Sequence, residues 1–211
     1  MEKLDKENNK DNKKSDENNK SKEKEKPTLS EEELELSKNI EDMVNGLLDH
    51  DIEIKRNAFN LLKKEITTST GSMTSIPKPL KFCRLHFEKV REAYNNEKTN
   101  NPNSEAQKLL GDFLCILVLV TDTQDTSLQY ILENGLTNFS EWGQELVRSL
   151  SGEITTEYLK RLDESKPSDD LVKLVSTAVN SLIHTHNENE AIDLLIELDL
   201  VEDIKNYCNE L

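Results

Sequence analysis

Apolar side chains recur at spacings of three and four residues along most of this chain. The first such set is Leu36, Ile40, Met43, Val44, Leu47 and Leu48. Because an α-helix turns once in about 3.6 residues, this spacing gathers the apolar side chains on one face that a helix can bury. No convincing strand pair or hairpin turn interrupts the pattern. The sequence therefore predicts an all-α fold, with consecutive antiparallel helices in an irregular solenoid or bundle. No fixed internal period is evident, so a regular repeat array is not expected.

The first two predicted helices have recognisable starts. Ser30 and Glu33 form a capping box, with Leu29 and Leu34 placed as a hydrophobic staple across it. Asp51 is suited to cap a second helix. Its predicted inward residues are Ile54, Ala58, Leu61, Leu62 and Ile66. Two helices packed through these faces are the expected beginning of the fold.

The middle of the chain continues the same pattern. A third apolar stripe comprises Leu80, Cys83, Phe87, Val90 and Tyr94. The Asn-rich residues 95–103 predict a loop. From Leu109 to Val120 the chain is apolar on nearly every face, which favours a central helix by its length. Its β-branched residues Ile116, Val118 and Val120 leave a buried strand as the alternative.

Four further segments complete the predicted helices. A short helix begins at Ser127 and ends at Asn134 and Gly135, a pair typical of a helix C-terminus. Ser140 is expected to cap a longer helix. Its predicted inward residues are Trp142, Leu146, Leu150, Ile154, Tyr158 and Leu162. Pro167 separates that helix from a segment spanning 171–183. The last predicted helix, from Glu188, turns inward Ala191, Leu194, Leu195 and Leu198.

Charge divides the chain into two parts. The first 26 residues contain nine Lys, eight Asp or Glu and almost no apolar side chain. Such a composition buries too little surface to offset the entropy of ordering, so residues 1–27 are predicted to be a disordered, charged Asn/Lys/Glu-rich tail. Residues 28–211 are predicted to form one all-helical domain.

The predicted domain is strongly acidic, since the whole chain carries a net charge of −15 and the tail is nearly balanced. An acidic surface repels phosphate backbones and anionic lipids, so no nucleic acid and no membrane partner is expected, whereas basic proteins are attracted. The longest apolar run, 113–120, is too short to span a bilayer. Three widely spaced cysteines, Cys83, Cys115 and Cys208, argue against a disulfide framework and fit a reducing compartment.

The stretch from Thr67 to Phe82, T-T-S-T-G-S-M-T-S-I-P-K-P-L-K-F, is unlike an ordinary helix or strand. Its hydroxyl residues and Gly71 disfavour a continuing helix. Pro77 and Pro79 push the residues before them away from helical angles, and Pro79 suits the first turn of a helix beginning near Leu80. From physics alone the segment is a connector that leads into a helix.

As sequence, that stretch resembles the family of the 26S proteasome non-ATPase regulatory subunit 2. Two more stretches resemble the same family in the same order: S-E-W-G-Q-E-L-V-R-S-L-S-G-E at 140–153, and H-N-E-N-E-A-I-D-L-L-I-E at 186–197. In the last one, Asn187 and Glu190 are separated by one spacer residue fewer than in the family. The resemblance covers about residues 30–211. Its signature positions, with no role assigned by the sequence, are Ser72, Met73, Thr74, Ser75, Pro77, Lys78, Pro79, Leu80, Lys81, Phe82, Trp142, Gly143, Arg148, Gly152 and Glu153.

The resemblance implies a non-catalytic scaffold in the base of the proteasome regulatory particle. It implies a role in ubiquitin-dependent protein degradation, in cytoplasm and nucleus, with the ATPase ring and other base subunits as partners. The family's surfaces for ubiquitin and shuttle factors lie in a later toroid of repeats, so ubiquitin binding is not carried over to this chain. A fragment, a split gene product and a truncated relative stay open. The alternative function is a free-standing acidic helical adaptor for a basic partner.

Candidate chemistry in the sequence is weak. Cys83 and His86 lie three residues apart but lack a third orienting residue, so a nucleophile and base pair is not favoured. His184 and His186 precede two glutamates, yet structural zinc would need a second ligand pair. Trp142 is interpreted as a core residue rather than an exposed partner anchor. We therefore expect no catalytic residues, no cofactor and no metal site.

Overall fold

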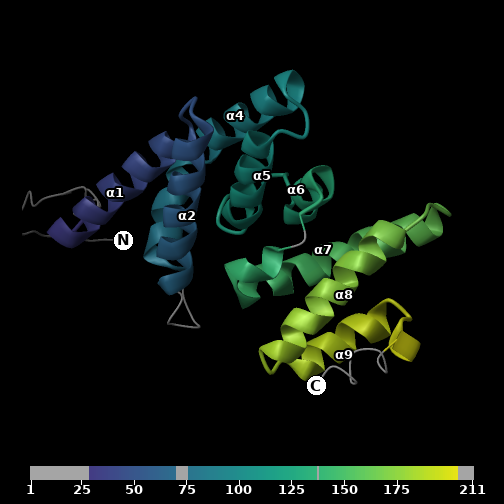
Figure 1. Ribbon diagram of the computed structural model, residues 1–211. Helices are drawn as coiled ribbons and strands as arrows, with labels where there is room; N and C mark the ends of the chain where they lie inside the picture. Colours follow the sequence, from purple (N-terminus) through teal and green to yellow (C-terminus); the bar gives the residue numbers. More distant parts are fainter. Residues whose placement is uncertain (1–28, 70–75, 137, 204–211) are drawn as a thin grey trace, which may run out of the picture.

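The computed structural model describes residues 29–69, 76–136 and 138–203. Within these ranges the regular structure is entirely helical and no strand occurs, which confirms the all-α prediction (Figure 1). The α-helices are α1 (Glu31–Leu47), α2 (Ile52–Thr68), α3 (Lys78–Cys83), α4 (Phe87–Asn100), α5 (Glu105–Val118), α6 (Ser127–Asn134), α7 (Gln144–Asp163), α8 (Asp169–His184) and α9 (Glu188–Glu197). Three 3₁₀ turns connect some of them: η1 (Arg84–His86), η2 (Phe139–Trp142) and η3 (Val201–Asp203). The predicted tail, 1–27, lies outside the described residues.

The helices follow one another in a solenoid-like order, with α1 and α2 at one end and α8 and α9 at the other (Figure 1). Helices α7 and α9 run parallel. Arg148 of α7 contacts Glu190 of α9, and Thr155 of α7 contacts Glu197 of α9, each across a separation of 42 residues. A constant separation along both helices requires that they point the same way. One continuous apolar core runs through all the α-helices.

Local capping follows the sequence prediction closely. The Ser30 side chain accepts from the Glu33 N–H, and the Glu33 side chain accepts from the Ser30 N–H, which completes the capping box. Asp51 accepts from the Glu53 N–H at 2.8 Å. Gly135 ends α6 with φ 61°, a left-handed angle that glycine adopts without strain. These caps fix where the helices begin and end.

The buried face of α2 differs from the prediction. Ile54 and Leu61 are 45% and 53% exposed, whereas Phe59 and Lys55 are buried. Phe59 packs edge-on against Trp142, with ring centroids 5.8 Å apart. Lys55 buries its aliphatic stem and donates from Nζ to the Leu47 carbonyl at the end of α1. The apolar residues of α2 allow either of two faces to be buried. The packing of the large Phe59 ring selects the face that contains it.

Two helix boundaries also differ. The predicted loop 95–103 is confirmed only at residues 101–103, because α4 continues to Asn100. Tertiary contacts outweigh the weak helix propensity of Asn: Lys98 pairs with Glu133 at 2.8 Å, and Tyr94 donates to the same carboxylate. In addition, α3 begins at Lys78, two residues before the predicted start at Leu80.

The start of α7 also differs from the prediction. Ser140 does not cap this helix, because it lies inside η2 and α7 begins only at Gln144. Gly143, with φ 105°, separates the two elements. Leu162, predicted to face inward, is 64% exposed, since it follows the part of α7 that the neighbouring helices cover. Residues 109–118 belong to α5 and most of them are buried, so the strand alternative is wrong.

No helix in the described ranges combines the length and apolar character needed to cross a membrane.

Candidate functional site

Trp142 joins three elements at the centre of the molecule. Its ring is buried against Phe59 of α2 and Phe113 of α5. Its Nε1 donates to Asp112 Oδ1 of α5 at 2.8 Å. Lys63 Nζ lies 5.2 Å from the ring and forms a 2.6 Å salt bridge with Glu141. The core interpretation of Trp142 is therefore confirmed, and an exposed partner anchor is excluded.

Asp112 is the acid of this cluster and is partly buried. Burial raises the pKa of its carboxyl, while the Trp142 hydrogen bond and the nearby Lys63 charge lower it by smaller amounts. A single hydrogen bond from the indole offsets only part of the cost of removing the carboxylate from water. The group therefore positions Trp142 at some expense to stability.

Arg148 connects the second signature stretch to the third. Its Nε donates to both carboxylate oxygens of Glu190 on α9, at 3.0 and 2.9 Å. Its NH1 donates to Glu145 at 2.9 Å, and its NH2 donates to Asn187 Oδ1 at 3.3 Å. One guanidinium thus holds α7, the α8–α9 turn and α9 together.

Asn187 and His186 form the turn that Arg148 contacts. His186 ends α8 with φ 59°, and the Asn187 N–H donates to the Leu182 carbonyl at 2.8 Å. The Asn187 side chain donates to the Thr185 carbonyl at 3.0 Å. The H-N pair of the third stretch therefore closes α8 and presents an amide oxygen to Arg148.

Glu153 caps a different helix from its own. Its Oε2 accepts from the Leu128 N–H at 2.7 Å, and the Ser127 N–H is a second backbone donor. Both donors lie in the first turn of α6, where N–H groups have no partner within the helix. Burial raises the pKa of Glu153, and the two backbone donors lower it by less. A carboxylate on α7 thus fixes the start of α6.

We call these contacts the signature junction, defined by Asp112, Trp142, Arg148, Glu153, Asn187 and Glu190. Gly143 belongs beside it, because its positive φ lets the chain turn from η2 into α7. Gly152 is exposed in the middle of α7, with nothing within 4 Å of a Cβ placed there. Nothing in the structure explains that glycine.

The first signature stretch is only partly described. Ser72, Met73, Thr74 and Ser75 lie outside the described residues. Pro77 is the N-cap of α3, and Pro79 and Leu80 are buried. Phe82 is partly buried against the core. Lys78 forms a 2.9 Å salt bridge with Glu33 of α1, whereas Lys81 is exposed. The stretch attaches α3 to α1 at one end of the molecule.

The residues considered for catalysis or metal binding are buried or already have partners. Cys83 is buried, and burial raises the pKa of its thiol to about 12, so it is not a thiolate at neutral pH. Burial also lowers the pKa of His86. Among the metal candidates, Glu190 is held by Arg148, and His186 lies 3.7 Å from Glu188. In the described part of the chain no three His, Cys, Asp or Glu side chains are grouped to hold a metal ion.

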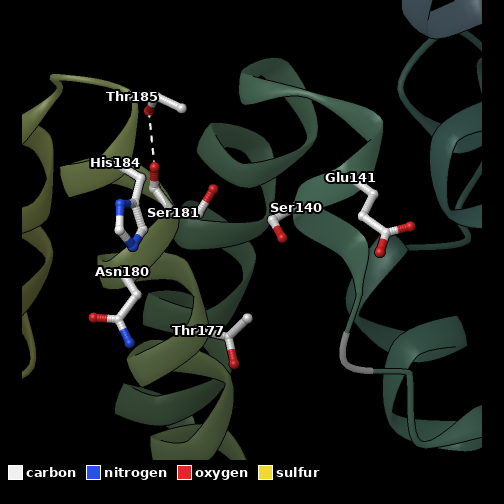
Figure 2. A pocket seen from close by; sticks show the side chains of 7 residues that line it. All are labelled: Ser140, Glu141, Thr177, Asn180, Ser181, His184 and Thr185. Carbon is white, nitrogen blue, oxygen red and sulfur yellow. Dashed lines mark hydrogen bonds between the residues drawn. The ribbon is translucent and has the colours of Figure 1, made fainter.

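A polar hollow lies between η2 and α8 (Figure 2). Its lining residues are Ser140, Glu141, Thr177, Asn180, Ser181, His184 and Thr185. The Thr185 hydroxyl donates to the Ser181 carbonyl of its own helix, and Glu141 is engaged by Lys63. Small-molecule sites are mostly apolar and enclosing, with a few convergent polar groups. This open, hydroxyl-rich surface has neither property, so it is not a convincing small-molecule site.

Comparison with known proteins assigns the chain to a family. The family model described as the RPN1 N-terminal domain matches residues 40–211. The chain belongs to the RPN1 N-terminal domain family. Among the described signature residues, Trp142, Arg148 and Glu153 contact neighbouring helices.

Curated relatives agree with that assignment. The 26S proteasome regulatory subunit rpn1 of Schizosaccharomyces pombe is 39% identical over 179 residues, which covers 83% of this chain and 20% of the relative. The 26S proteasome non-ATPase regulatory subunit 2 of Dictyostelium discoideum is 39% identical over 186 residues, covering 87% and 20%. Homolog A of that subunit in Arabidopsis thaliana is 37% identical over 192 residues, covering 86% and 21%. The chain thus spans about a fifth of the length of these relatives.

Sequence reasoning missed Asp112 and the connecting roles of Asn187 and Glu190. A signal for Asp112 existed, since it is the one charged residue in the apolar run 109–120. Asn187 and Glu190 were within the third signature stretch, but their partner is 39 to 42 residues away. Only the packing of α7 on α9 brings these groups together.

Proposed function

We propose that this domain is a non-catalytic part of a proteasome regulatory subunit and acts through protein contacts. The observation that carries the proposal is its membership of the RPN1 N-terminal domain family, whose curated relatives are named as regulatory subunits of the 26S proteasome. The partners in this proposal are the ATPase ring and other base subunits. The process is ubiquitin-dependent protein degradation, in cytoplasm and nucleus.

The signature junction supports a scaffold more than an enzyme. Its polar groups satisfy one another, as the contacts of Arg148 and Glu153 illustrate. In the described residues no buried side-chain nitrogen or oxygen lacks a hydrogen-bond partner. Groups committed in this way hold helices in fixed positions, which is what a binding surface requires.

Affinity purification tests the proposal. The tagged full chain is expressed in cells and recovered at moderate salt, and proteasome subunits in the eluate are quantified by mass spectrometry. We expect the ATPase subunits and other base subunits to be enriched over a tag-only control. A paired Trp142→Ala and Glu153→Ala variant, which loses the junction, should lose that enrichment. Reproducible absence of base subunits from the wild-type eluate would refute the proposal.

An acidic adaptor is the second candidate, favoured by the net charge of −15. The same purification distinguishes this adaptor from a proteasome subunit. Recovery of a basic protein without the ATPase ring, lost when salt is raised, would support the adaptor.

The domain division at residue 28 is part of this proposal. Limited trypsin digestion is expected to remove the Lys-rich residues 1–27 first and leave a stable fragment that begins near residue 28. Uniform cleavage throughout the chain would contradict that division.

A further inference from the structure

One segment of this acidic molecule is basic. The segment 78–91 contains five Lys or Arg residues and one acid, Glu88, whereas the whole chain has a net charge of −15. The segment runs through α3, η1 and the first turn of α4. Local charge of the opposite sign creates a distinct field at short range, even when the net charge of the molecule is negative.

The helical spacing of the segment separates a buried face from an exposed one. Leu80, Cys83, Phe87 and Val90 are buried and attach the segment to the core. Lys81, Arg84, Leu85 and Lys89 are exposed at the complementary positions of the same helical run, beside the exposed Glu88, which pairs with Arg91. We call these four residues the basic face.

The three cations of the basic face are available for a partner. Lys78 is engaged by Glu33, and Arg91 is engaged by Glu88 and Asp125. By contrast, Lys81, Arg84 and Lys89 form no salt bridge with any acid in the described ranges. In a chain with 42 Asp and Glu residues, three neighbouring cations without such a pair are notable.

Leu85 adds an apolar contact at the centre of this charge. Its side chain is 69% exposed, more than any other large apolar residue in the described part of the chain. An exposed apolar side chain ringed by cations offers both desolvation energy and charge complementarity to a ligand. Such a combination fits a segment that itself has apolar and acidic side chains.

We propose that the basic face binds an acidic segment of another protein, with an apolar side chain of that segment against Leu85 and its carboxylates against Lys81, Arg84 and Lys89. The net charge of −15 repels acidic peptides and nucleic acids alike, so the apolar and aromatic groups of the segment decide between these two ligands. The aromatic Phe87 of the segment is buried and offers no ring for base stacking. This proposal is independent of whether the chain enters proteasomes.

The test measures fluorescence anisotropy of a labelled peptide with the repeating unit Glu-Glu-Glu-Leu, titrated with the full chain at low salt. We expect saturable binding that weakens as salt is raised. Reversing the three charges together, with Lys81→Glu, Arg84→Glu and Lys89→Glu, should weaken binding about tenfold or more. Leu85→Ala should weaken it about fivefold, because one apolar contact is lost.

A matched control separates the basic face from the overall field. The triple variant Lys38→Glu, Lys108→Glu and Lys173→Glu changes the net charge equally, at three exposed positions elsewhere. We expect it to bind the peptide within about twofold of the wild type. Because each substitution is at an exposed position, we expect every variant to fold, and circular dichroism checks this.

Four outcomes would overturn the proposal. They are no saturable binding of the peptide, equal weakening by the two triple variants, equal affinity for a peptide with Ala in place of Leu, and tighter binding of a single-stranded oligothymidine than of the acidic peptide. The last outcome would assign the face to nucleic acid instead.

Discussion

Asp112 lies beneath Trp142, and burial raises the pKa of its carboxyl above the usual range. A carboxyl whose pKa is higher in the folded state contributes stability that is fully present below its unfolded pKa. That contribution is lost as the pH rises through the folded pKa, because the native state must then hold a buried charge. Glu153 has the same direction of shift and the same cause.

We therefore expect Asp112→Asn to be neutral or stabilising at neutral pH. The amide oxygen can still accept from Trp142 Nε1, and no charge is buried. Between about pH 4, the usual pKa of an unfolded Asp, and about pH 7, the free energy of unfolding of the variant should rise relative to that of the wild type. Urea denaturation across this range measures the effect. A loss above about 1 kcal/mol at pH 7 would show that attraction to Lys63 outweighs desolvation.

Glu153 gives a second prediction at a single residue. Glu153→Ala leaves the Leu128 and Ser127 N–H groups without their acceptor, and should lower the free energy of unfolding by about 1–3 kcal/mol. Glu153→Gln keeps an acceptor oxygen and should cost less than about 1 kcal/mol. Glu157, one turn later on α7, forms ion pairs with Lys160 and Arg161 of the same helix. Equal losses from Glu153→Ala and Glu157→Ala in urea denaturation would contradict the capping role.

At this scale the sequence predicts local partners and misses distant ones. The Ser30 and Glu33 box needs only three residues of separation and one helix start, so it is legible in the sequence. The Arg148 and Glu190 contact joins residues 42 apart. It depends on the path of α8 between them, which no local rule supplies.

Two glycines inside helices provide a test at the scale of the element. Gly111 of α5 lies against Asn134 of α6, whose Cγ would be 2.8 Å from an added Cβ. Asn134 is buried and bonded to Gln107, Tyr94 and Tyr130, so it cannot move without breaking those bonds. Gly152 of α7 has open space where its Cβ would be.

The same substitution should therefore have opposite signs at the two positions. Gly152→Ala should raise the free energy of unfolding by about 0.5–1 kcal/mol, because alanine favours a helix over glycine. Gly111→Ala should lower it by about 1–3 kcal/mol through overpacking. Thermal and urea denaturation compare the pair directly. A gain in stability from Gly111→Ala would mean that α5 and α6 do not approach as closely as described.

Element type was predictable because the apolar spacing is strong in every segment, and the C-terminus of α6 at Gly135 followed from one residue pair. Element rotation and exact length were not. The face of α2 depended on Phe59 meeting Trp142, which is 83 residues later in the sequence. The extension of α4 depended on Lys98 meeting Glu133. Both are tertiary contacts that override local preference.

At the scale of the whole molecule, the signature stretches act as connections between helices that are distant in sequence. The second stretch reaches α5 through Trp142, α6 through Glu153 and α9 through Arg148. In the third stretch, Asn187 accepts a hydrogen bond from Arg148 of the second. Residues 72–75 of the first stretch lie outside the described residues, and the sequence assigns them no role.

A double-mutant cycle between Arg148 and Glu190 tests that account most directly, since each residue belongs to a different stretch. The free energy of unfolding is measured by urea denaturation for the wild type, Arg148→Ala, Glu190→Ala and the double variant. Because both side chains are partly exposed, we predict a coupling energy of about 0.5–1 kcal/mol, with the double variant less destabilised than the sum of the single ones. Strictly additive losses would contradict the claim that the two stretches are joined in the folded protein.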